Sequence, residues 1–197
     1  MKLNLIFPTP VYNIIDEADD CRRQQLRDAC LQISNNPEVS QKKNIFHRVG
    51  TSHLIDDQLH KREAFLPLAA HINKHSTEFI TALGFPGWHM DIARMWTNVG
   101  TPGDFVYPHT HVGDGFLAGV FYVSCDKRDG ISILDAVERT SPEVSNDLNC
   151  SSYYYEGIEG RLLMFRAETL HTTFPQQGEE RIIISFNLQL HKPDKDT

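Results

Sequence analysis

The chain has 197 residues, of which 40% are hydrophobic and 23% are charged, and its formal net charge is −7. This length suits one domain with a substantial core, and the hydrophobic content excludes a globally disordered protein. The acidic balance, with Lys and Arg scattered along the chain, argues against a general nucleic-acid or anionic-membrane surface. We therefore expect neither nucleic acid nor membrane as a partner.

Cysteine usage and the first residues indicate a reducing compartment. The four cysteines lie far apart and form no Cys-x-x-Cys pair, so they predict neither a disulfide framework nor a zinc finger. The N-terminus lacks the basic lead and apolar run of a secretion signal, and no stretch approaches the length of a membrane span. We expect a cytoplasmic protein.

The first part of the chain reads mainly as helical. Residues 3–15 predict a short strand pair interrupted by prolines. Residues 17–34 and 64–84 place apolar side chains at helical spacing, which predicts two amphipathic helices. His71 and His75 lie four residues apart on the second helix. That spacing suits a metal, but nothing else in the sequence supports one there.

From residue 88 onward the pattern changes to short apolar or alternating runs bounded by Gly, Asp, Asn and Pro. These runs predict at least six strands, at 90–99, 115–124, 130–137, 152–157, 160–165 and 180–190. Helices followed by strands indicate the α+β class, with a sheet sandwich or barrel backed by N-terminal helices. The polar run 138–152 is a long connection that we expect to form a lid or an irregular excursion.

His109 and His111 begin the stretch "HTHVGDGFLAGVFYV". Residues two apart in a strand share a face, so the two imidazoles form a plausible half of a metal site. Taken alone, the same spacing describes two surface histidines equally well. His171, which follows a buried strand and a turn, supplies a third candidate ligand.

Arg181 opens a strand rich in β-branched residues. An arginine inside such a strand is costly to bury unless it meets an anion, and its planar fork suits a carboxylate. Ser185, four residues on, shares its face and offers a hydroxyl to the same carboxylate. The alternative is an ordinary ion pair of Arg181 with Glu179 or Glu180 at the strand end.

The order of these elements resembles the iron(II)/2-oxoglutarate-dependent oxygenases. It comprises His-x-His, "GVFYV", "GRLLMF", a further His and "ERIIISFN". The sequence is most similar to short bacterial and phage members that open with a stretch like "IFPTPVY". The resemblance implies a double-stranded β-helix with the metal near one open end. It also implies Fe(II) and 2-oxoglutarate as cofactors, with O2 as the second small-molecule cosubstrate.

The resemblance also assigns roles to individual residues. His171 is the distal metal ligand, and Arg181 binds the distal carboxylate of 2-oxoglutarate. Ser185 and Tyr122 assist Arg181, and Asn98 faces the same cavity. No catalytic residue is expected beyond the metal ligands, since the cofactors carry out the difficult step.

The sequence departs from the family at the first ligand pair, which is usually His-x-Asp or His-x-Glu. If His109 fills the first position, His111 takes the carboxylate position and the site has three histidines. If His111 comes first, Gly113 stands where the carboxylate should be. We favour His109, His111 and His171, with Asp114 and Asp135 as reserve carboxylates.

We expect residues 1–197 to form a single oxygenase-like domain. Helical support occupies about 1–87, and the β-helix core occupies about 88–191. The implied reaction is hydroxylation of a C–H bond in a protein, peptide or small molecule, with release of succinate and CO2. Two alternatives stay open: a cupin that binds metal through three histidines without 2-oxoglutarate, and an inactive structural relative.

Overall fold

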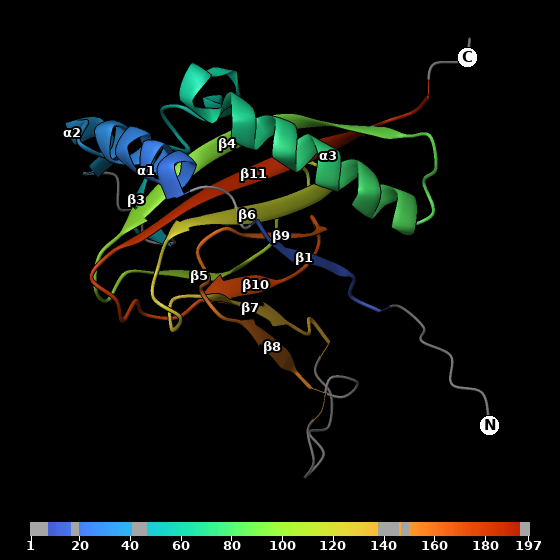
Figure 1. The fold of residues 1–197 in the computed structure, drawn as a ribbon. Helices are drawn as coiled ribbons and strands as arrows, with labels where there is room; N and C mark the ends of the chain where they lie inside the picture. Colours follow the sequence, from blue (N-terminus) through green and yellow to red (C-terminus); the bar gives the residue numbers. More distant parts are fainter. Residues whose placement is uncertain (1–7, 17–19, 41–46, 138–145, 147–149, 194–197) are drawn as a thin grey trace.

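The computed structural model describes residues 8–16, 20–40, 47–137, 146 and 150–193. These residues form two antiparallel sheets with helices over the outer face of one of them (Figure 1). The arrangement agrees with the expected α+β class and with two facing sheets of a double-stranded β-helix.

The larger sheet, here called the major sheet, has six strands in the order β1-β9-β6-β11-β4-β3. Its longest strands, β4 and β11, pair along their whole length. The strands of this sheet are β1 (Val11–Ile15), β3 (Gly50–Thr51), β4 (His89–Gly100), β6 (Leu117–Ser124), β9 (Arg161–Arg166) and β11 (Arg181–His191).

The smaller sheet, the minor sheet, has five strands in the order β2-β5-β10-β7-β8. It lies below the major sheet in Figure 1. Its strands are β2 (His47–Arg48), β5 (Phe105–His109), β7 (Ile131–Leu134), β8 (Ser152–Tyr155) and β10 (His171–Thr173).

The helices cover the face of the major sheet that points away from the minor sheet (Figure 1). The main ones are α1 (Asp20–Ser34) and α3 (Leu66–Ala82), which confirm the two predicted helices. Short elements complete the layer: α2 (Pro37–Ser40), η1 (Leu59–Lys61) and η2 (Glu63–Phe65). Pro67 lies in the first turn of α3, and Gly84 follows its end with a φ of 91°, a left-handed conformation that glycine adopts without strain.

Alternation along β11 divides the interior into two layers. Ile182, Ile184, Phe186 and Leu188 face the helices and join the larger apolar cluster. The intervening residues face the minor sheet, where Tyr122, Ile133 and Phe165 belong to a second, smaller cluster. Because side chains alternate strictly between faces, Arg181, Ser185 and Asn187 all point between the two sheets.

The structure adds strands that the sequence did not predict. β5 and β10 are the functionally important ones, since they carry His109 and His171. The segment before residue 88 also contributes three strands to the sheets: β1 lies within the strand pair predicted at residues 3–15, whereas β2 and β3 were not predicted. Residues 1–7, and most of the expected lid at 138–152, lie outside the described residues.

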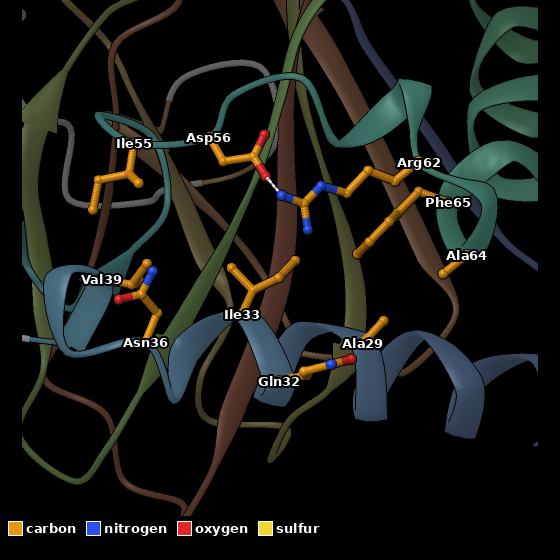
Figure 2. A pocket seen from close by; sticks show the side chains of 10 residues that line it. All are labelled: Ala29, Gln32, Ile33, Asn36, Val39, Ile55, Asp56, Arg62, Ala64 and Phe65. Atoms are coloured by element: carbon orange, nitrogen blue, oxygen red, sulfur yellow. Dashed lines mark ion pairs between the residues drawn. The ribbon is translucent and has the colours of Figure 1, made fainter.

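A pocket of about 360 Å³ opens on the helical side, between α1 and the segment that leads to α3. Figure 2 shows the Asp56–Arg62 ion pair across it, with Ile33 and Phe65 nearby. This pocket lies on the helical face of the major sheet, whereas the candidate ligands face the minor sheet. Within the described residues, no helix combines the length and apolar character needed to cross a bilayer.

Candidate active site

Three histidine side chains meet at the end of β5. His109 is the last residue of β5 and pairs directly with His171, the first residue of β10. The ring centroid of His171 lies 4.2 Å from that of His109 and 5.2 Å from that of His111. One potential ligand atom from each of the three lies within 4.8 Å of the others. This spacing suits coordination of one metal ion.

His111 reaches the cluster by a different route from the one that strand geometry suggests. β5 ends at His109, so His111 lies beyond the strand, just before a turn at 112–114. Its backbone N–H donates to the carbonyl of Ala167 at 2.8 Å, which fixes this segment beside the approach to β10. The convergence of His109 and His111 therefore depends on this contact as well as on the strand.

Two of the imidazoles are oriented by backbone carbonyls. His109 Nδ1 lies 2.8 Å from the Tyr107 carbonyl oxygen, and His171 Nδ1 lies 2.9 Å from that of Thr169. Because a carbonyl only accepts, Nδ1 must carry the proton, and the lone pair is then on Nε2. Such an outer hydrogen bond is typical of metal-binding histidines.

Burial keeps these rings neutral. It lowers the pKa of His171 to about 3, with the neighbouring His109 adding to the effect. Burial also lowers the pKa of His109, against the opposing hydrogen bond to Tyr107. Imidazole binds metal only in its neutral form, so these two rings can act as ligands at neutral pH.

The reserve carboxylates lie outside the histidine cluster. Asp114 is partly exposed and has an oxygen 3.7 Å from Arg94 Nη1. Asp135 accepts a hydrogen bond from the backbone of Val137 at 2.9 Å. Among the described residues, the cluster that contains His109 and His171 is completed by His111.

Arg181 is 2% exposed and points between the sheets. Its Nη1 atom is buried and makes no hydrogen bond within the described part of the chain. Burial lowers the pKa of Arg181, while Tyr122 and Asp129 oppose this effect. A guanidinium stays charged in proteins, so the buried cation fits an incoming carboxylate.

Neither alternative partner forms an ion pair with Arg181 among the described residues: none joins it to Glu179, and Glu180 is bound by another arginine. The Glu180 carboxylate receives two hydrogen bonds of 2.8 Å from Arg27 on α1. This bidentate pair holds the Glu180 side chain on the helical side of the sheet. An ordinary ion pair of Arg181 with Glu180 is therefore not formed.

The other predicted cosubstrate residues share the inner face with Arg181. Asn98 Nδ2 donates to Ser185 Oγ at 3.0 Å, across the β4–β11 ladder. Tyr122, on β6, is 1% exposed and pairs with Ile183 on β11. Burial raises the pKa of its phenol, which therefore stays protonated and able to donate a hydrogen bond. The structure thus brings all four predicted residues to one face of one sheet.

Two further residues were missed by the sequence analysis. The His53 ring packs against Trp96 in a tilted arrangement, with ring centroids 4.3 Å apart. The Trp96 ring centroid lies 6.0 Å from that of His111, so these rings lie beside the cluster. Asn187 is fully buried, and neither of its amide atoms has a hydrogen-bond partner among the described residues. It lies six residues after Arg181 and two after Ser185 on β11. Residues an even number of positions apart in a strand share a face, so this spacing could have predicted its place in the site.

Comparison with known families identifies the domain. A family described as "Putative 2OG-Fe(II) oxygenase" matches residues 94–187, which include His109, His111, His171 and Arg181. This segment is a 2OG-Fe(II) oxygenase domain. The match confirms the predicted family, enzyme class and cofactors. Curated protein sequences give no significant match.

Solved structures of such enzymes share the fold. A Pseudomonas putida prolyl-4-hydroxylase has a TM-score of 0.66 and 15% identity, with 93% of each chain covered. A collagen prolyl hydroxylase from Paramecium bursaria Chlorella virus-1 has a TM-score of 0.58 and 15% identity, with 90% of this chain and 94% of that chain covered. HygX from Streptomyces hygroscopicus, solved with nickel, 2-oxoglutarate and hygromycin B, has a TM-score of 0.59 and 11% identity, with coverages of 96% and 85%.

The oxygenase domain offers the donors that its cofactors need. Imidazoles with lone pairs suit iron(II), and three ligands leave positions open for other groups. Arg181 Nη1 and the Asn187 amide are buried and have no hydrogen-bond partner in the described part of the chain, so they suit a polar anion between the sheets.

The Asn187→Leu variant tests whether the Asn187 amide binds the cofactors or has a structural role. A buried unsatisfied polar group costs about 1–3 kcal/mol, so an apolar side chain of similar size should leave the free energy of unfolding of the apoprotein unchanged or raise it. The increase in the free energy of unfolding that Fe(II) and 2-oxoglutarate produce should become smaller in Asn187→Leu.

The matched control, Asn98→Leu, removes the hydrogen bond to Ser185 and should lower the free energy of unfolding of the apoprotein by about 0.5–1.5 kcal/mol. Both quantities come from urea unfolding. Equal destabilisation by the two variants would show that Asn187 has a structural role.

Proposed function

We propose that this oxygenase hydroxylates a C–H bond of a protein or peptide side chain. Iron(II) is held by His109, His111 and His171, and 2-oxoglutarate is anchored by Arg181. The observation that supports this best is the placement between the two sheets of a histidine cluster and a buried guanidinium whose Nη1 has no hydrogen-bond partner among the described residues.

The histidine cluster is the metal centre in this proposal. Bound Fe(II) supplies the chemistry, activating O2 with 2-oxoglutarate as the co-reductant, which is released as succinate and CO2. The chain fixes the direction of the lone pairs, because the carbonyls of Tyr107 and Thr169 hold the Nδ1 protons of His109 and His171. The rings then lose little conformational freedom when they bind the ion.

Arg181 positions the cosubstrate. Its fork offers two parallel hydrogen bonds to the distal carboxylate, and low local polarity strengthens them. Ser185, Asn98 and Tyr122 line the same face, so their donors are available to the rest of the molecule. The hydrogen bond from Asn98 to Ser185 Oγ leaves the serine hydroxyl proton available to donate.

Apolar walls limit access of water to this space. Ile133, Val120 and Phe165 are buried in the inner cluster, and the Phe165 ring lies 4.7 Å from that of His171. Exclusion of water strengthens the charge interactions of Arg181 and limits side reactions.

An exposed apolar rim supports a protein or peptide substrate. Tyr107, Val112 and Phe174 are 47%, 71% and 60% exposed, and each lies within three residues of a different histidine ligand. Exposed apolar groups gathered near a site are typical of contact surfaces for other chains. Two of the compared structures are prolyl hydroxylases, which agrees with this class of substrate.

The organisation of the chain fits a single working domain. Strand β1 pairs with β9, and β3 pairs with β4, so the N-terminal segment completes the sheet that carries Arg181. We infer that residues 1–197 act as one unit in a reducing cytoplasm. Cys30, Cys125 and Cys150 form no disulfide, which supports that compartment.

Arg181→Lys should weaken 2-oxoglutarate binding by about 1.5–3 kcal/mol, roughly 10- to 150-fold in Kd, because lysine keeps the charge but loses the two-point fork. Calorimetric titration of the Fe(II)-loaded protein measures this. Arg128→Lys is the matched control, since Arg128 is exposed and pairs with Asp126. Unchanged affinity in Arg181→Lys would exclude Arg181 as the anchor, whereas absence of 2-oxoglutarate binding by the unmodified Fe(II)-loaded protein would favour the cupin alternative.

The substrate class is tested by turnover. Succinate release is measured with Fe(II), 2-oxoglutarate and ascorbate, first with a library of peptides and then with amino acids and other small molecules. We expect peptides to stimulate succinate release and to gain 16 Da by mass spectrometry, the mass of one oxygen atom. Tyr107→Ala should weaken this stimulation without changing 2-oxoglutarate affinity. Stimulation by small molecules alone would overturn the peptide assignment but not the oxygenase activity.

A further inference from the structure

A second cluster of potential metal ligands lies on the ribbon formed by β4 and β11. His89 and Asp91 are two residues apart on β4 and share a face, and His191 on β11 pairs directly with His89. One ligand atom from each lies within 4.8 Å of the others. The cluster shares no residue with the active site, and it lies at the end of β11 opposite to Arg181.

The separations fit a single ion. His191 Nε2 lies 3.5 Å from Asp91 Oδ2, and the rings of His89 and His191 stack with centroids 5.1 Å apart. Ligand atoms on a tetrahedral zinc ion are about 3.4 Å apart when each bond is about 2.0–2.1 Å. The His191–Asp91 pair already has this spacing, and His89 offers the third donor within 4.8 Å of both.

The donor set selects a class of metal. Two imidazoles and one carboxylate suit zinc and its first-row neighbours, whereas Mg²⁺ and Ca²⁺ prefer oxygen ligands. We propose that His89, Asp91 and His191 bind a divalent transition-metal ion of the zinc class, with solvent completing the coordination.

The site is structural in character. The side chains of His191 and Asp91 are 46% and 65% exposed, so the ion faces solvent and not an enclosed reaction space. The ion ties the start of β4 to the end of β11. These two strands carry Asn98, Arg181 and Ser185. The ion bound by His89, Asp91 and His191, here called the clip, therefore stabilises the framework of the oxygenase site. Binding to the folded state alone raises apparent stability.

Zinc stoichiometry tests the proposal, with protein purified without a histidine tag and equilibrated with ZnCl2 before metal analysis. We expect two zinc ions per chain in the unmodified protein, one in His191→Ala, one in His171→Ala and none in the double variant. His75→Ala is the control, because His75 lies on α3 and hydrogen-bonds Tyr12; it should keep two. In the His171→Ala background, zinc should still raise the thermal midpoint, and His89→Ala should abolish that rise.

Two outcomes would overturn the second site. One is an unmodified protein that binds a single zinc ion lost in His171→Ala, and the other is a His191→Ala variant that keeps two. A single zinc ion lost only in His191→Ala would instead contradict the proposed metal centre while supporting the clip. Retention of 2-oxoglutarate turnover in His191→Ala separates the two sites further, since that residue has no part in the reaction.

Discussion

The pairing of β5 with β10 is the constraint on which the rest of the site depends. These short strands place His109 directly opposite His171, and a side chain in a strand has only two faces to choose from. A shift of one residue in this register would turn one imidazole away from the other. The contact of His111 with Ala167 secures the third ligand at the same place. The pairing of these two strands of the minor sheet therefore sets the geometry of the proposed metal centre.

The charges of the site follow from these ligands. In the proposed site, three imidazole ligands, which carry no negative charge, would leave the full double charge of iron(II) uncompensated, whereas the more common carboxylate ligand would reduce it by one. In the proposed site, the dianion of 2-oxoglutarate would balance that charge, and Arg181 would bind its distal carboxylate. A neutral ligand set therefore favours tighter binding of the cosubstrate and makes the metal more dependent on it. Asp114 and Asp135 lie outside the cluster, in agreement with this charge balance.

The parts predicted well from sequence are those with long, regular patterns. The apolar spacing of α1 and α3, and the long apolar or alternating runs of β4, β6 and β11, needed no tertiary information. β5 and β10 were missed because they have five and three residues, too few for a period to show, and β5 contains Pro108. His53 belongs to no motif, and only tertiary packing brings its ring onto Trp96. Asn187 could have been predicted, since it lies an even number of residues from both Arg181 and Ser185 and therefore shares their face of the strand.

The most direct measurement is an anaerobic titration of the apoprotein with iron(II) and then with 2-oxoglutarate, followed by visible absorption spectroscopy. The account predicts a saturable charge-transfer band in the unmodified protein. The band should vanish in His171→Ala and need far more 2-oxoglutarate in Arg181→Lys. Iron binding without any band would contradict chelation of 2-oxoglutarate at this centre, and absence of iron binding would leave the three histidines as a structural cluster.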